Sequence, residues 1–278
     1  MRIGIFAKTF VRPTLVETLD AVLSSGLDCV QFNMACAGLP SMPDKITPEE
    51  AERIKQAHES RGLAMAAVSG TFNMIHPDLV QRAEGIRRLA ILAGACRNLG
   101  TQVITLCTGT RDPENMWRRH PDNDSAQAWE DLRCSMAEAL EIAERNNVIL
   151  AIEPEIANVI DSAAKGRKLL DKMKSPRLKI VMDGANLFHR GELARMDEIL
   201  REAFALLGRD LILAHAKDLD RDGEAGNKAA GTGVLNYDLY LQLLQQVEYS
   251  GPLVLHGLEE SEVPFSVEFL KGKLAQLN

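Results

Sequence analysis

The chain has 278 residues, of which 46% are hydrophobic and 26% are charged. This is the composition of an ordinary soluble globular protein, and the length is sufficient for one large hydrophobic core. Lys and Arg number 32 against 39 Asp and Glu, which gives a formal net charge of −7. An acidic balance disfavours nucleic acid and anionic membranes as partners. No apolar stretch approaches the roughly 20 residues that a membrane span needs.

The cysteines and the N-terminal residues bear on the cellular compartment. The chain has five cysteines, an odd number, and none of them stands in a C-x-x-C spacing. Small buried thiols in a reduced protein explain this usage. Residues 1–6 have the pattern of a strand and reach Lys8 too early for the apolar region of a signal peptide. We therefore expect a cytoplasmic protein.

Short apolar runs alternate with helical patterns along the whole chain. Strands are predicted at residues 2–7, 28–33, 63–69, 103–107, 148–153, 178–183, 210–217 and 251–256. Helices are predicted at residues 13–25, 47–61, 77–100, 125–146, 161–173, 193–207, 237–247 and 264–277. Such alternation implies parallel strands with right-handed crossovers. Eight units in a chain of this length predict a (β/α)8 TIM barrel, here a single domain that covers residues 1–278. An open doubly wound sheet would carry glycines after the first strand, where residues 7–10 read AKTF.

Several helix boundaries have specific signals. Thr47 is a predicted N-cap, Pro48 occupies the first turn, and Glu50 completes a capping box with Thr47. Gly26 and Gly62 follow two predicted helices, in the position where glycine commonly ends a helix.

The fifth to eighth predicted strands each end in a residue able to bind a divalent metal. Pro154 stops the fifth strand, because proline cannot donate to a sheet ladder. Neighbouring strands of a barrel bring their carboxyl ends to one rim, where barrel enzymes bind their ligands. A single polar residue at a strand end is explained as well by ordinary hydrogen bonding, but its repetition in four consecutive strands predicts a metal site. The residues are Glu153, Asp183, His215 and His256.

Two carboxylates with two imidazoles make a mixed oxygen and nitrogen site. This mixture suits Mn²⁺, Co²⁺, Fe²⁺ or Zn²⁺, and Mg²⁺ less well because of the imidazoles. We expect a divalent metal at this site, with Mn²⁺ the preferred ion.

Several motifs resemble the xylose isomerase-like barrel superfamily, and in particular its sugar phosphate isomerase/epimerase branch. These are Glu153, Asp183 with Asn186 three residues later, His215 through Asp218 (HAKD), and the segments 70–78 (GTFNMIHPD), 107–112 (CTGTRD), 116–117 (MW), 120–123 (HPDN), 231–233 (GTG) and 255–258 (LHGL). The resemblance covers nearly the whole chain, and the loop segments are its more specific part.

The resemblance implies one divalent metal held by Glu, Asp, His and Glu from strands five to eight. Glu153, Asp183 and His215 match the first three positions, whereas His256 stands where relatives most often have glutamate. In the 3-epimerases of the family, two metal-bound glutamates move protons on opposite faces of the substrate. The replacement by His256 therefore puts a two-base mechanism in question, and Glu259 or Glu260 is the alternative that could reach back.

The expected chemistry is removal of a proton next to a carbonyl, with a metal-stabilised enediolate as the product of that step. Glu153 is the candidate base, and one base is sufficient for a 1,2 aldose–ketose shift. Inversion of a carbon also needs a donor on the other face, for which His256 is a candidate. An isomerase is therefore slightly favoured over an epimerase, and an inosose-type dehydratase begins with the same step.

Candidate substrate-binding residues surround the predicted metal. They are His76, Asn186, Lys217, Glu155 and Trp117, with Asn158 as a weaker candidate. For Lys217 the alternative is a surface lysine, for His76 a loop-packing role, and for Trp117 packing or a subunit contact. The Gly231–Gly233 segment is either a phosphate-binding loop or a simple turn. His58 and His189 are expected on the surface.

Three classes of function remain open: a metal-dependent isomerase or epimerase of a sugar, sugar phosphate or keto-polyol; an endonuclease IV-like phosphodiesterase; and a non-catalytic sugar-binding barrel. The phosphodiesterase would need several metals and a basic track for DNA, which the net charge of −7 disfavours. The replacement at His256 keeps the binding barrel open. A small-molecule sugar or keto-polyol is the expected partner, and a homodimer or homotetramer is the oligomer considered.

Overall fold

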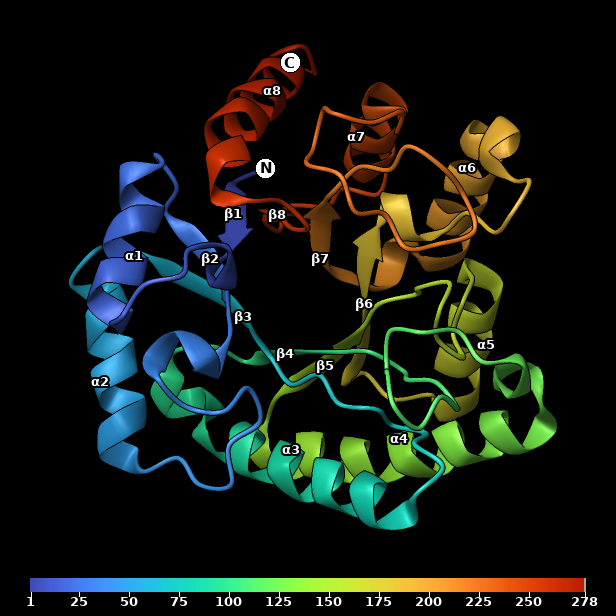
Figure 1. Ribbon diagram of the computed structural model, residues 1–278, viewed down its shortest axis with the longest axis horizontal. Helices are drawn as coiled ribbons and strands as arrows, with labels where there is room; N and C mark the ends of the chain where they lie inside the picture. Colours follow the sequence, from blue (N-terminus) through green and yellow to red (C-terminus); the bar gives the residue numbers. More distant parts are fainter. Residues whose placement is uncertain (278) are drawn as a thin grey trace.

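The computed structural model describes residues 1–277 and contains a closed barrel of eight parallel strands, each paired with its neighbours in chain order (Figure 1). The strands are β1 (Ile3–Phe6), β2 (Cys29–Phe32), β3 (Ala64–Ser69), β4 (Val103–Leu106), β5 (Ile149–Ile152), β6 (Leu178–Asp183), β7 (Leu211–Ala216) and β8 (Leu253–Leu255). β1 pairs with both β2 and β8, which closes the sheet on itself. The predicted (β/α)8 barrel is confirmed.

One major helix follows each strand. These helices are α1 (Leu15–Ser24), α2 (Pro48–Glu59), α3 (Leu79–Leu99), α4 (Ala126–Asn146), α5 (Ala163–Met173), α6 (Met196–Leu207), α7 (Tyr237–Gln246) and α8 (Val263–Ala275). Figure 1 shows them around the barrel in chain order, from α1 at the left through α3 and α4 below to α8 at the top. The predicted boundaries differ from these by a few residues at most.

Local signals in the sequence explain several of these boundaries. The Thr47 hydroxyl accepts from the Glu50 N–H at 3.1 Å, and the Glu50 carboxylate accepts from the Thr47 N–H at 2.8 Å. This is the predicted capping box at the start of α2. Gly26 and Gly62 follow α1 and α2 with φ of 74° and 65°. In this left-handed region glycine has no steric penalty, so both glycines let the chain leave its helix.

The apolar residues form two clusters, because strand side chains alternate between the two surfaces of the barrel. The larger cluster lies between the strands and the surrounding helices. The smaller one fills the inside of the barrel with one residue from each of five strands, and consists of Ala67, Ala151, Val181, Leu213 and Val254.

Polar residues form the next layer inside the barrel, toward the carboxyl ends of the strands. A side chain two positions further along a strand points to the same side. From Ala151 this rule leads to Glu153, and from Val181 to Asp183. On β7 and β8 it leads to His215 and His256. Inside the barrel, an apolar layer is thus followed, toward the carboxyl ends of the strands, by a layer of polar residues that can take part in chemistry.

His58 corrects one of the expectations. We expected it on the surface, but its side chain is 2% exposed. It follows Ala51 and Ile54 on the buried face of α2 and meets the Phe32 ring edge-on, with 5.0 Å between the ring centroids. Its Nδ1 donates to the Ile54 carbonyl at 2.8 Å. His58 is therefore a core residue of the layer between α2 and β2.

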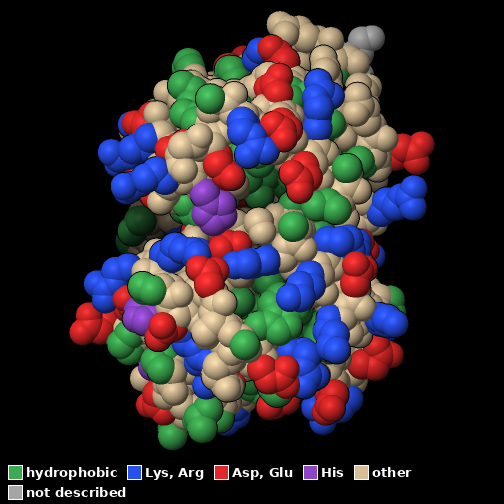
Figure 2. All heavy atoms as spheres, turned by 90° about the vertical axis from the view of Figure 1, so that its right-hand side faces the viewer, with side chains coloured by type: hydrophobic (Ala, Val, Ile, Leu, Met, Phe, Trp, Pro, Cys, Tyr) green, Lys and Arg blue, Asp and Glu red, His purple; other side chains and the backbone are tan. Residues whose placement is uncertain are grey.

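No helix within residues 1–277 is both long enough and apolar enough to cross a bilayer. On the face nearest α5 and α6, which Figure 2 shows, basic and acidic side chains are interspersed. That face therefore carries no continuous basic track.

Candidate active site

Three side chains converge at the carboxyl ends of β5, β6 and β7. Glu153, Asp183 and His215 each offer one ligand atom, and these atoms lie within 4.8 Å of one another. His215 Nδ1 is 3.5 Å from Glu153 Oε2 and 3.6 Å from Asp183 Oδ2. The Asp183 and His215 side chains are excluded from solvent, whereas that of Glu153 is 20% exposed. Glu153 is thus the member of the group with access to solvent.

Positive charge compensates for the burial of Asp183. Lys217 Nζ lies 3.1 Å from Asp183 Oδ2, and the other carboxylate oxygen accepts from the Ala185 N–H at 3.0 Å. Burial alone would raise the pKa of Asp183, but the charges of Lys217 and His215 outweigh it and hold the pKa well below its usual value. Burial would lower the pKa of His215, but Glu153 and Asp183 outweigh it and raise the pKa to about 9.

Asn186 connects the two carboxylates. Its side-chain amide donates to Glu153 Oε1 at 2.6 Å and lies 3.4 Å from Asp183 Oδ2. Its carbonyl oxygen accepts from the Gly226 N–H at 3.0 Å, which fixes the orientation of the amide. Asn186 therefore fixes the orientation of the Glu153 carboxylate relative to Asp183.

His256 completes the predicted set of four but is held differently. Its ring is stacked between His215, 4.9 Å away, and Phe6, 5.3 Å away. Its Nδ1 is buried and has no hydrogen-bond partner within the described residues. Burial, with the charges of His215 and Lys217, holds the pKa of His256 well below 6.5. The compact group of ligand atoms found within residues 1–277 does not include His256, so its place as fourth ligand stays a prediction.

The residues present fit a divalent metal. Buried polar atoms are almost always hydrogen-bonded, yet His215 Nδ1 is buried between two carboxylates without a partner. Two carboxylate oxygens and an imidazole nitrogen are ligands that first-row divalent ions accept. A metal bound by Glu153, Asp183 and His215 would satisfy the unpartnered nitrogen and both charges.

Comparison with known proteins places this barrel in a family. The profile of the xylose isomerase-like TIM barrel matches residues 19–272. The chain belongs to this family. The resemblance found in the sequence is therefore confirmed, together with the fold that it implied.

Individual members of the xylose isomerase-like family are distant relatives. L-ribulose-5-phosphate 3-epimerase UlaE of Shigella flexneri serotype 5b (strain 8401) is 22% identical over 211 residues, which are 74% of this chain and 69% of that protein. The UlaE of Shigella boydii serotype 18 (strain CDC 3083-94 / BS512) is 24% identical over 195 residues, 69% of this chain and 62% of that protein. The chain thus spans about two thirds of the length of the curated relatives. Both relatives are named as sugar epimerases, in agreement with the expected class of enzyme.

Solved structures share the fold. A D-tagatose 3-epimerase-like protein has a TM-score of 0.78 at 15% identity, over 100% of this chain and 98% of that one. The IolI protein, whose structure contains a zinc atom, has a TM-score of 0.72 at 15% identity, over 98% of this chain and 96% of that one. At such identities the likeness concerns the fold alone.

Glu155, two residues after Glu153, is buried and held by its own loop. Its carboxylate accepts from the Ala157 N–H at 2.9 Å and from the side-chain amide of Asn158. Asn158 in turn accepts from the Gly109 N–H at 2.5 Å. Burial raises the pKa of Glu155 to about 7, and the charge of Glu153 acts in the same direction. Through these bonds Glu155 and Asn158 connect the β5–α5 loop to the β4–α4 loop. Contact with a substrate stays a prediction for both residues.

The two candidates from the loops after β3 and β4 differ in burial. Both ring nitrogens of His76 are engaged, with Nε2 3.1 Å from the Pro113 carbonyl and Nδ1 accepting from the Asp78 N–H at 3.0 Å. His76 thus has the loop-packing role considered above. Trp117 is 59% exposed, and its backbone N–H donates to Asn115. Substrate contacts of His76 and Trp117 stay predictions.

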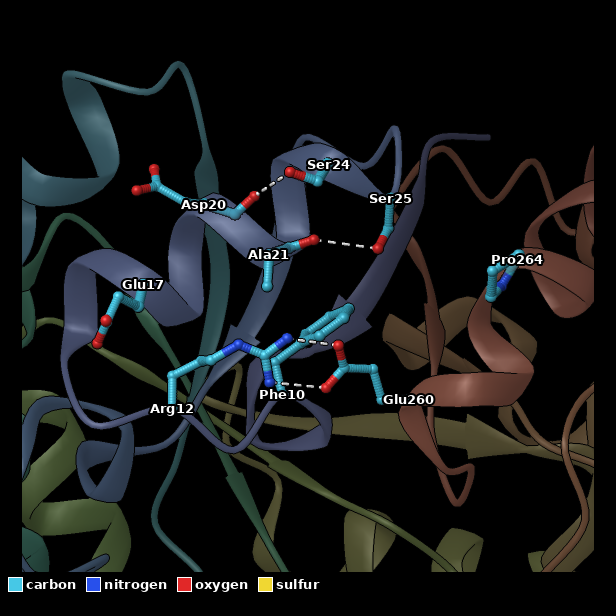
Figure 3. Close-up of a pocket in the computed structure, with 9 residues that line it drawn as sticks. All are labelled: Phe10, Arg12, Glu17, Asp20, Ala21, Ser24, Ser25, Glu260 and Pro264. Atoms are coloured by element: carbon cyan, nitrogen blue, oxygen red, sulfur yellow. Dashed lines mark hydrogen bonds and ion pairs between the residues drawn. The ribbon is translucent and has the colours of Figure 1, made fainter.

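Glu259 and Glu260 have roles outside the site. Glu260 forms a two-bond ion pair with Arg12, with distances of 2.8 and 2.5 Å. Figure 3 shows this pair across a groove of about 480 Å³ between α1 and the start of α8. Glu259 caps the short helical turn before α8 through a capping box with Glu262. Neither glutamate belongs to the compact group of ligand atoms formed by Glu153, Asp183 and His215.

The Gly231–Gly233 segment is a turn around a buried carboxylate. Asp218 is 1% exposed and accepts from the N–H groups of Gly231, Leu219 and Leu235, at 3.1, 2.9 and 2.9 Å. A phosphate needs free backbone N–H groups, and the N–H of Gly231 already has an anionic partner. The geometry therefore favours the turn over the phosphate-binding loop.

Sequence reasoning missed Gln31 on β2. Its side chain is 4% exposed and contacts His215, 184 positions away in the chain. A glutamine inside a strand whose neighbours are apolar was the available signal.

Proposed function

We propose that this protein is a divalent-metal-dependent isomerase or epimerase of a sugar, sugar phosphate or keto-polyol that acts by proton transfer at a carbon next to a carbonyl. The observation that carries the proposal is the position of Glu153. It is the part-exposed member of a group whose other side chains are buried, and Asn186 holds one of its oxygens at 2.6 Å. The named activities of the relatives, which are sugar epimerases, support the same class of reaction.

The metal would be held by Glu153, Asp183 and His215, with His256 at the fourth position and Mn²⁺ the preferred ion. When bound, it would supply a Lewis acid for the negative charge that develops on the substrate's oxygens. Glu153 would remove the proton, and the hydrogen bond from the Asn186 amide to Oε1 would hold its carboxylate in place for this step. The buried ammonium of Lys217 keeps Asp183 ionised beside it.

The number of side chains that can transfer a proton to or from the substrate bears on the type of reaction. A 1,2 shift between aldose and ketose needs one base on one face, which Glu153 provides. Epimerisation needs a second group on the opposite face, and His256, stacked on His215, is the candidate. The N–H of Gly231 is bonded to Asp218 and is therefore not available to a substrate phosphate.

Metal content is the first test. The protein would be purified without chelator or immobilised-metal column, loaded with Mn²⁺ and desalted, and metal would be counted per chain in the native protein and in Asp183→Asn. We expect about one metal per native chain and loss of the metal in D183N. Two or three metals per chain would instead favour phosphodiester hydrolysis. No metal under any loading condition would overturn the proposal.

Activity is tested by proton exchange. The Mn²⁺-loaded protein would be incubated in D2O with a panel of ketoses, inososes and their phosphates, and deuterium incorporation and product stereochemistry would be followed by NMR. We expect exchange that Glu153→Gln abolishes and that Glu268→Gln, the same change at an exposed site on α8, leaves intact. Metal binding without exchange on any member of the panel would favour a binding barrel.

A further inference from the structure

Gln31 contacts His215 inside the barrel and has no role in the proposed function. Its side-chain oxygen lies 2.8 Å from His215 Nε2, and its side-chain amide donates to Thr105 Oγ1 at 3.2 Å. All three side chains are at most 5% exposed. Hydrogen bonds are stronger at a site excluded from solvent, so these two bonds fix the orientation of the side chains that they join.

The register of the barrel places Gln31 at this level. β2 pairs Val30 with Met65 but Gln31 with Ala67, so one residue of β3 is passed over between the two pairs. Such irregularities re-aim side chains and are frequent beside active sites. On its other side Gln31 pairs with Phe6, whose ring stacks on His256. Gln31 thus belongs to the same layer as the candidate metal ligands.

The contact with Gln31 determines which nitrogen of His215 is free. An amide oxygen can only accept, so His215 Nε2 must carry its proton toward Gln31. Nδ1, which lies 3.5 Å from Glu153 and 3.6 Å from Asp183, is then the nitrogen whose proton a metal would displace. The hydroxyl of Thr105 can accept or donate. The Thr105 hydroxyl can therefore accept from the NH2 group of Gln31, and this bond fixes the orientation of the Gln31 amide.

We propose that Gln31 is a positioning residue that holds His215 in the Nε2–H tautomer, so that Nδ1 is the nitrogen that binds the metal. The inference rests on the metal site of the proposed function. Groups that accept the second ring proton of a metal-bound histidine fix its tautomer and orientation, and their loss typically costs about 10–100-fold in metal affinity.

Two substitutions separate the hydrogen bond from packing. Gln31→Met keeps the approximate length and volume of the side chain but has no acceptor, whereas Gln31→Glu keeps an acceptor for His215 Nε2. Co²⁺ affinity would be measured from the visible absorption of the bound ion, with Gln56→Met on the exposed face of α2 as the control. We expect Q31M to bind Co²⁺ about 10–100-fold more weakly, and Q31E and Q56M to bind within a few-fold of the native protein or more tightly.

A spectroscopic measurement reports the tautomer directly. In the Zn²⁺-loaded protein labelled with ¹⁵N-histidine, His215 should show a slowly exchanging Nε2–H proton. In Q31M this proton should move upfield and exchange faster. A His215 with its proton on Nδ1 in the loaded native protein would overturn the inference.

The affinity results distinguish failure of the inference from failure of the proposed function. Native protein that binds Co²⁺ while Q31M binds it equally well would overturn the role of Gln31 and leave the metal site standing. Equal weakening in Q31M and Q31E would also overturn it, because packing alone would then explain the effect. Native protein that binds no metal would overturn the proposed function itself. Thermal unfolding of each variant would show that it is folded.

Discussion

Lys217 Nζ and Asp183 Oδ2 form a buried ion pair at 3.1 Å, with side chains that are 5% and 0% exposed. Burial would lower the pKa of Lys217, but the carboxylates of Asp183 and Glu153 outweigh it and raise the pKa. The lysine is thus a counterion built into the wall of the candidate metal site. A metal ion would approach a carboxylate that already has one positive partner.

Loss of that counterion should make stability depend on metal. Lys217→Met leaves the charge of Asp183 buried with only His215 to offset it, and breaking a buried pair typically costs about 3–5 kcal/mol. We expect this loss in metal-free protein and a smaller one with saturating Mn²⁺, which would supply positive charge at the same carboxylate. Urea unfolding with and without Mn²⁺ measures both values. Lys172→Met, on an exposed part of α5, is the control. Equal penalties in the two conditions would contradict the shared role of Asp183.

Asn186 should affect turnover more than metal binding. Asn186→Ala removes the amide that holds Glu153 Oε1 at 2.6 Å, while the ligand atoms themselves remain. A misplaced catalytic group can cost about 100-fold in rate, so we expect kcat to fall by about 10–100-fold and Mn²⁺ affinity to change much less. The measurement is steady-state kinetics with a sugar that the native protein converts, beside a Mn²⁺ titration. Asn98→Ala, on the exposed side of α3, should match the native protein. Unchanged kcat would show that Glu153 needs no such support.

The strand ends were predictable because strand periodicity is strict. Each apolar run buries its residues, and the residue two positions after an inward-facing one also faces inward. Val181 and Asp183, like Leu213 and His215, follow this rule, so the sequence alone could place the active residues on one rim. The capping box at Thr47 was predictable for a similar reason, since both partners lie within one turn.

Contacts between distant segments were not predictable. Gln31 meets His215 across 184 positions, and the irregular register between β2 and β3 that aims it leaves no mark in the sequence. The ion pair of Glu260 with Arg12 joins the two ends of the chain in the same way. His58 is a different case, because its spacing from Ala51 and Ile54 already placed it on the buried face of α2. There the polarity of the residue type was given more weight than its position.

His58 should make the fold sensitive to acid. Burial lowers its pKa below 6.5, and its Nε2 has no partner in the core. Below about pH 6.5, His58 therefore binds a proton in the unfolded chain that it does not bind in the folded protein. Stability is lost as pH falls through this range, by up to about 1.4 kcal/mol per pH unit from this residue. His58→Leu removes this contribution, so urea unfolding of metal-free protein between pH 7.5 and 5 should show a smaller loss in the variant. Parallel curves for the two proteins would count against the argument.

His256 decides whether the candidate site has three protein ligands or four. His256→Phe preserves the stack between Phe6 and His215 but removes the buried Nδ1 that has no partner. If that nitrogen binds metal, Mn²⁺ affinity should fall by more than the roughly 10-fold that loss of a supporting group can cost. His256→Glu restores the residue that the family resemblance places there, and it should bind Mn²⁺ at least as tightly as H256F. A titration of both variants beside the native protein gives the answer. Equal affinity in H256F and the native protein would leave a site of Glu153, Asp183 and His215 with its fourth position open to substrate.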